Sequence, residues 1–177
     1  MAVAGTTPWT FVLDEPTRIL VVDDDPILRE FATVHLASPS ATIETTADGA
    51  AARRLLEEGA YDLLLLDIEM PGLDGFSLLK EIRSNEKLRD LPVIMLTVHD
   101  DVASIDRSYQ LGANSFATKP VNWRQLSYQI RSILRANRAN GTAGRHQTQP
   151  RNEATSHIGT PATEPEYSRL GDILVVE

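Results

Sequence analysis

The chain has 177 residues, of which 42% are apolar and 24% are charged, so it is long enough for one globular domain with a sizeable core and additional terminal segments. It contains no cysteine, which excludes disulfides, thiolate metal sites and cysteine nucleophiles, and its formal net charge of −8 argues against binding to a nucleic-acid backbone. Because no apolar run approaches the roughly 20 residues that span a bilayer, and residues 1–16 lack the pattern of a secretion signal, we expect a cytoplasmic protein that does not insert into membranes.

From Arg18 onwards, short apolar runs alternate with amphipathic stretches, a rhythm typical of βα units that build a parallel sheet. Strands are predicted over residues 19–22, 41–45, 63–66, 93–96 and 115–117, and helices over residues 26–36, 50–58, 76–84, 102–111 and 122–138. The runs LVV, LLLL and VIML are continuously apolar, as in strands covered on both faces, and we expect them at the sheet centre. The predicted fold class is therefore α/β, with a doubly wound, five-stranded parallel sheet.

The last predicted helix has a clear apolar side. Its large aliphatic residues recur at three- and four-residue spacing and predict one buried stripe: Leu126, Ile130, Ile133 and Leu134. We interpret Trp123 and Tyr128 as further packing residues of this helix. Its arginines, Arg124, Arg131, Arg135 and Arg138, are interpreted as a solvated face, with an interaction surface as the alternative.

The flanking segments differ in composition from the predicted domain. Residues 1–16 are interpreted as an N-terminal extension, residues 17–138 as the domain, and residues 139–177 as a polar, disordered linker or tail. Apolar residues return only from Tyr167 onwards. Residues 169–177 are similar to the opening of the N-terminal domain of type II secretion and pilus ATPases, so the alternative is that a second domain begins near Tyr167.

Polar side chains follow four of the predicted strands, and parallel strands bring their carboxyl ends to one edge, where ligands bind. These residues are Asp23, Asp24, Asp25, Asp67, Thr97 and Lys119. Clustered carboxylates resist ionisation unless a cation neutralises them, so they indicate a hard divalent metal such as Mg²⁺. A carboxylate in such a site can become an acyl phosphate, while an ammonium and a hydroxyl can bind the phosphoryl oxygens.

Four segments together resemble the receiver domain of response regulators: VVDDDP, LLLLDIEMPGLDG, MLT and FATKP. They occur in this order with intervals of 43, 30 and 22 residues from Asp24 to Asp67, Thr97 and Lys119. The resemblance covers residues 17–138 and implies a flavodoxin-like, CheY-like (βα)5 fold. It also implies that Asp67 is the phosphorylation site of a two-component phosphorelay.

The resemblance assigns roles to the other site residues. Mg²⁺, or Mn²⁺, would be held by the carboxylates of Asp23, Asp24 and Asp67 and by the backbone carbonyl of Glu69. Thr97 and Lys119 would bind the phosphoryl group. Phe116 matches the aromatic position that turns inward on activation, and the bond between Lys119 and Pro120 is often cis in the family.

Three positions are expected to modulate the lifetime of the acyl phosphate. Val98 stands where the family usually has a smaller residue, and its side chain would narrow access for a phosphodonor or for water. Glu69 and His99 each lie two residues beyond a site residue, at positions that tune this lifetime in the family.

By the same resemblance, the protein is a signalling switch and not an enzyme. Its partner would be a sensor histidine kinase or a histidine phosphotransferase, and it would form a homodimer through the fourth helix, fifth strand and fifth helix. Two alternatives are an aspartate-nucleophile phosphohydrolase of the haloacid dehalogenase type, with Asp23 as nucleophile and Asp25 as acid, and a binding module that works without phosphorylation. Asp25 is interpreted as a helix cap instead of a metal ligand, and Asp74 is interpreted as a turn residue instead of a catalytic acid.

Overall fold

The computed structural model describes residues 16–98 and 102–144. Strands and helices alternate along the chain. The strands are β1 (Thr17–Val22), β2 (Ala41–Thr46), β3 (Leu63–Asp67), β4 (Val93–Thr97) and β5 (Ser115–Thr118). The helices are α1 (Pro26–Leu36), α2 (Gly49–Glu58), α3 (Gly75–Ser84), α4 (Val102–Gln110) and α5 (Trp123–Gly144).

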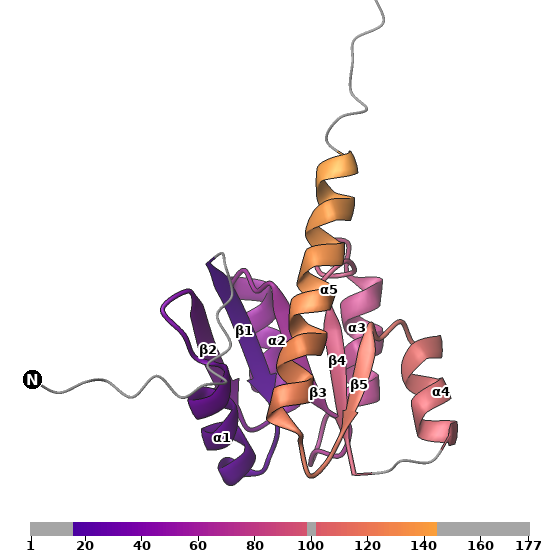
Figure 1. Ribbon diagram of the computed structural model, residues 1–177. Coiled ribbons are helices and arrows are strands. Elements are labelled where there is room, and N and C mark those ends of the chain that lie inside the picture. Colours follow the sequence, from indigo (N-terminus) through magenta and orange to yellow (C-terminus); the bar gives the residue numbers. More distant parts are fainter. Residues whose placement is uncertain (1–15, 99–101, 145–177) are drawn as a thin grey trace, which may run out of the picture.

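The five strands form one parallel sheet in the order β2-β1-β3-β4-β5. The three continuously apolar strands therefore occupy the centre, as predicted. Helices α1 and α5 cover one face, and α2 and α3 cover the other (Figure 1). In the register, Val22 of β1 lies beside Leu66 of β3, which lies beside Met95 of β4, so the carboxyl ends of these strands are level.

Each face of the sheet has its own hydrophobic core because successive side chains of a strand point to opposite faces. Leu64 and Leu66 pack with α2 and α3, whereas Leu63 and Leu65 pack with α1 and α5. All four are fully buried, and burial of one such side chain contributes about 1.5–3 kcal/mol. Helix α4 is anchored differently, since Ser108 is its buried residue.

Aspartates begin the first three helices. The side chain of Asp25 accepts a hydrogen bond from the Ile27 N–H at 2.9 Å, and that of Asp74 accepts one from the Ser77 N–H at 3.0 Å. Asp48 caps α2 in the same way. The interpretation of Asp25 and Asp74 as residues that shape helix starts and turns is confirmed.

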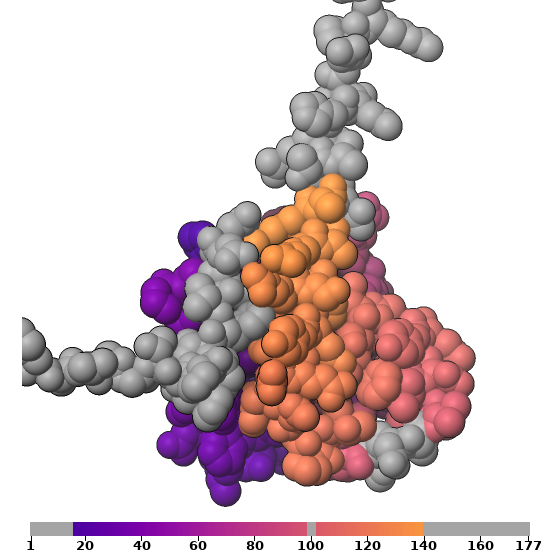
Figure 2. Space-filling model, viewed as in Figure 1, coloured from indigo at the N-terminus to yellow at the C-terminus, as the bar shows by residue number. Residues whose placement is uncertain are grey.

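Two expectations about α5 are wrong. The helix ends at Gly144 instead of Arg138, because its backbone hydrogen bonds continue into the polar segment, where composition had suggested a linker. Its last turns project beyond the sheet (Figure 1), and the space-filling view shows the outer side of α5, in orange, along the middle of this face of the molecule (Figure 2). Tyr128 is 59% exposed: it lies two residues from both Leu126 and Ile130, about 200° around the helix from each, and so faces away from the buried stripe.

The remaining boundaries differ from the predicted ones by at most two residues. The N-terminal extension, His99 and the segment from residue 145 to the end lie outside the described residues. The expectations of a disordered tail and of a second domain near Tyr167 therefore stay predictions.

Candidate functional site

The predicted site residues converge at the carboxyl edge of the sheet. Asp23 directly follows β1, Asp67 ends β3, Thr97 ends β4 and Lys119 follows β5. The side chain of Lys119 bridges two of these strands: its Nζ lies 2.7 Å from Asp23 Oδ2 and 3.0 Å from Asp67 Oδ1. Residues separated by almost 100 positions in the sequence thus form one ion-pair cluster.

Burial and charge shift the ionisation of this cluster. The pKa of Asp67 is raised to about 6, because burial and the nearby charge of Asp23 raise it by more than the hydrogen bond from Lys119 lowers it. A hydrogen bond from the backbone N–H of Glu69 also lowers the pKa of Asp67. For Lys119, burial would lower the pKa, but its hydrogen bonds to Asp23 and Asp67 raise it. The ammonium therefore stays charged, while the carboxyl of Asp67 resists ionisation in the absence of a second cation.

The acidic residues fit a hard divalent metal. Asp23, Asp24 and Asp67 each offer a carboxylate oxygen, and these oxygens lie within 4.8 Å of one another. Asp24 is exposed, whereas Asp23 and Asp67 are buried, so the site is open to solvent on one side. An all-oxygen set of this kind suits Mg²⁺ or Mn²⁺, which keeps several water ligands. The contribution of the Glu69 carbonyl stays a prediction.

Arg29 is a neighbour of the site that the sequence analysis missed. Its Nη1 donates a hydrogen bond of 2.6 Å to the backbone carbonyl oxygen of Asp23. The position of Arg29 could have indicated this contact. A cation in the first turn of a helix interacts unfavourably with the helix dipole, so a compensating contact of its side chain is expected.

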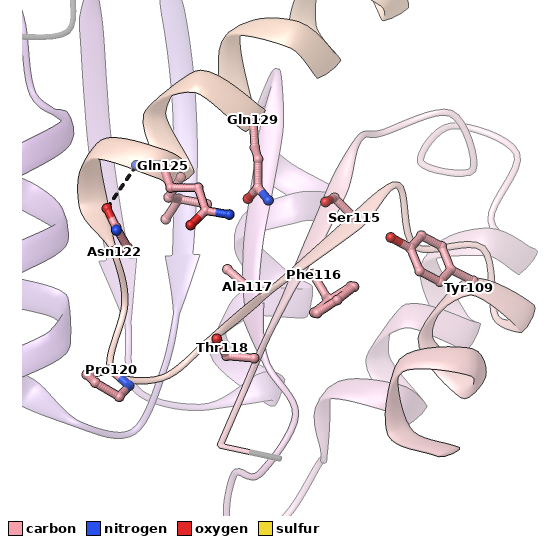
Figure 3. Close-up of a pocket in the computed structure, with 10 residues that line it drawn as sticks. Tyr109, Ser115, Phe116, Ala117, Thr118, Pro120, Asn122, Gln125 and Gln129 are labelled. Carbon is pink, nitrogen blue, oxygen red and sulfur yellow. Dashed lines mark hydrogen bonds between the residues drawn. The ribbon is translucent and has the colours of Figure 1, made fainter. Parts of the chain in front are cut away.

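Two predicted switch residues, Thr97 and Phe116, belong to β4 and β5, which are neighbours in the sheet. Thr97 is buried, with 2% of its surface exposed, and Val98 is 53% exposed. Phe116 is half-buried and meets Tyr109 of α4 edge to face, with ring centroids 6.0 Å apart. The two rings line a cavity of about 200 Å³ between α4, β5 and α5 (Figure 3). The peptide bond between Lys119 and Pro120 is cis, as expected.

The fold and the acidic cluster together define a CheY-like receiver domain of two-component signalling. The sequence profile described as the response regulator receiver domain matches residues 19–131. The chain therefore belongs to the response regulator receiver family, whose members are signalling switches. This membership argues against the phosphohydrolase alternative, as does the use of the Asp25 carboxylate as the cap of α1.

Similar proteins include the heme response regulator HssR of Staphylococcus aureus (strain JH9), which is 36% identical over 118 residues, 67% of this chain and 51% of that protein. The chain thus spans about half the length of the curated relatives it matches. A putative response regulator from Chloroflexus aurantiacus J-10-fl has a TM-score of 0.65 and 30% identity, with coverage of 68% of this chain and 99% of the other. The Mn(2+)-bound form of response regulator Rcp1 has a TM-score of 0.56 and 28% identity, with coverage of 67% and 91%. None of the described helices is long and apolar enough to cross a membrane.

Proposed function

We propose that this chain accepts a phosphoryl group on Asp67 from the phosphohistidine of a sensor histidine kinase or a histidine phosphotransferase. One observation carries the proposal: the Asp67 carboxylate lies 3.0 Å from the ammonium of Lys119 and within 4.8 Å of carboxylate oxygens of Asp23 and Asp24. A carboxylate next to a fixed cation and close to two further candidate metal ligands is suited to accept a phosphoryl group.

The transfer forms one bond and breaks one. A carboxylate oxygen of Asp67 attacks the phosphorus, the phosphorus–nitrogen bond to the donor histidine breaks, and the imidazole leaves with a proton from solvent. The ammonium of Lys119 and the hydroxyl of Thr97 bind phosphoryl oxygens, where negative charge accumulates. Bound Mg²⁺, or Mn²⁺, held by the three aspartates and the Glu69 carbonyl, supplies further neutralisation of that charge.

The acyl phosphate then changes an interaction surface. Phe116 and Tyr109 meet edge to face and line the cavity between α4, β5 and α5, so repacking of these rings would bias the face formed by these three elements between two states. We propose a homodimer through this face. Val98, Glu69 and His99 set the lifetime of the phosphorylated form. The protein acts in the cytoplasm as a switch, and the only phosphoryl chemistry it performs is on itself.

The test is phosphorylation by acetyl phosphate with Mg²⁺, followed by intact-mass measurement and mapping of the modified residue. The unmodified chain gains one phosphoryl group at Asp67, and Asp67→Asn gains none. Asp90→Asn is the matched control, because Asp90 is an exposed aspartate that precedes β4 and so lies at the opposite edge of the sheet from the cluster; it is labelled like the unmodified chain. Labelling at Asp23 would contradict the proposal in favour of the phosphohydrolase scheme, and absence of any label would favour a phosphorylation-independent module.

A further inference from the structure

The turn that follows β1 carries the first two metal-ligand candidates, and Arg29 holds its backbone. Strand β1 ends at Val22, so the carbonyl of Asp23 has left the sheet ladder and needs another donor. The donor is the guanidinium of Arg29, the fourth residue of α1. Its Nη1 lies 2.6 Å from the carbonyl oxygen of Asp23, and the hydrogen bond is partly buried.

The position of Arg29 is unfavourable for the helix alone. A cation in the first turn of α1 faces the positive end of the helix dipole, which is unfavourable for the helix. Within the described residues, Arg29 makes no ion pair that would compensate for this position. The contact with Asp23 is therefore the interaction that accounts for an arginine here.

Four contacts hold Asp23, and each comes from a different part of the fold. Its N–H donates to the Thr46 carbonyl of β2 at 3.2 Å, and its Oδ1 accepts from the Asp25 N–H at 2.9 Å. Its Oδ2 lies 2.7 Å from Lys119 Nζ. The Arg29 bond to its carbonyl completes the set and restrains the peptide group that joins Asp23 to Asp24.

We propose that Arg29 is a positioning residue of the metal site: it clamps the turn so that the carboxylates of Asp23 and Asp24 converge with that of Asp67. This inference rests on the proposed function. Arg29 acts through the backbone and contacts neither metal nor phosphoryl group.

Two effects of Arg29 on metal binding oppose one another. Its positive charge repels a divalent cation, but that charge is half-exposed and screened by solvent and salt. Its hydrogen bond to the Asp23 carbonyl holds the carboxylates of Asp23 and Asp24 in position for the metal. Loss of a residue that orients metal ligands typically weakens metal affinity 10- to 100-fold. The positioning effect of Arg29 is therefore larger than its charge repulsion, and removal of Arg29 weakens metal binding even though the site becomes more negative.

The test is titration of the metal-free protein with Mn²⁺ alone, with free Mn²⁺ followed by electron paramagnetic resonance and Mg²⁺ added as competitor. Arg29→Ala binds Mn²⁺ about tenfold more weakly, and Arg29→Lys, which keeps a donor of nearly the same reach, recovers most of the loss. Arg54→Ala is the matched control, because it removes the same charge from an exposed site on α2, and its affinity stays within about twofold of the unmodified chain. Thermal unfolding accompanies each titration, and should Arg29→Ala not fold, Arg29→Met carries the same comparison with the methylene packing kept.

Equal or tighter Mn²⁺ binding in Arg29→Ala, or in Arg29→Met, would overturn the inference and leave Arg29 as a local charge only. Failure of Arg29→Lys to recover affinity would overturn it as well. A different result identifies failure of the proposed function itself: the unmodified chain would then bind no Mn²⁺ and accept no phosphoryl group on Asp67.

Discussion

Replacing Gly75 by alanine tests how closely the start of α3 is packed against the end of β3, whose last residue is Asp67. A Cβ at this position would lie 2.1 Å from the backbone oxygen of Asp67 and 2.9 Å from Cα of Ile68. Both are backbone atoms, so neither can rotate away as the end of a flexible side chain could. Either the first turn of α3 or the end of β3 must move, and this displacement carries Asp67 with it.

The magnitude follows from two opposing contributions. Overpacking in a rigid site costs about 1–3 kcal/mol, and a contact between backbone atoms on both sides belongs at the upper end. Alanine is more favourable than glycine in a helix, which stabilises the variant by up to about 1 kcal/mol. The expected net loss for Gly75→Ala is therefore about 2 kcal/mol, or roughly 7 °C in the unfolding midpoint of a domain of this size.

The assay is urea and thermal unfolding followed by circular dichroism, together with Mn²⁺ affinity by electron paramagnetic resonance. Lys80→Ala is the control, because Lys80 is an exposed residue of the same helix and should leave both measurements nearly unchanged. An unchanged midpoint in Gly75→Ala would refute the packing argument. An unchanged Mn²⁺ affinity in a destabilised variant would show that the helix start yields while Asp67 stays in place.

Three further predictions concern the charged residues. Lys119→Met leaves two buried carboxylates without their cation, so the metal-free protein loses about 3–5 kcal/mol of stability in urea unfolding. Saturating Mg²⁺ should restore part of this loss. Equal stability of the variant with and without Mg²⁺ would contradict the prediction. Because the folded protein raises the pKa of Asp67 to about 6, the folded state binds the proton more tightly than the unfolded state. The stability of the metal-free protein therefore falls as the pH rises from about 4 to about 6, and Asp67→Asn should remove this part of the slope. Arg83 donates to the carbonyls of Gly112 and Leu91 at 2.8 and 2.9 Å, so Arg83→Ala should cost at least about 2 kcal/mol without lowering phosphorylation of the fraction that remains folded.

Much of the fold and the site was predictable because the signals are local in sequence. Each strand is a short apolar run followed by a polar residue, and the rule that parallel strands end at one edge places Asp67 and Lys119 together without further information. The cap at Asp25 follows from its place before Pro26. These predictions needed only the alternation of elements and the chemistry of one residue at a time.

The rest depends on where side chains point, which spacing alone leaves open. Tyr128 is an exception, because its two-residue spacing from Leu126 and Ile130 already places it on the side of α5 opposite the buried stripe; it was assigned to packing because it is aromatic. Arg29 was missed because its partner is a backbone carbonyl, which has no sequence signature. The last turns of α5 were missed because backbone hydrogen bonds continue through residues whose composition resembles that of a linker.

The sparse anchoring of α4 has a consequence for how the domain moves. Helix α3 buries five of its residues, among them Phe76, Leu79 and Ile82, whereas α4 buries Ser108. The free energy needed to detach a helix scales with the apolar surface it buries, so α4 is the low-stability helix of the pair. Its backbone amides should exchange with solvent deuterium faster than those of α3, and α4 is the helix that we expect to move most if Asp67 is phosphorylated as proposed.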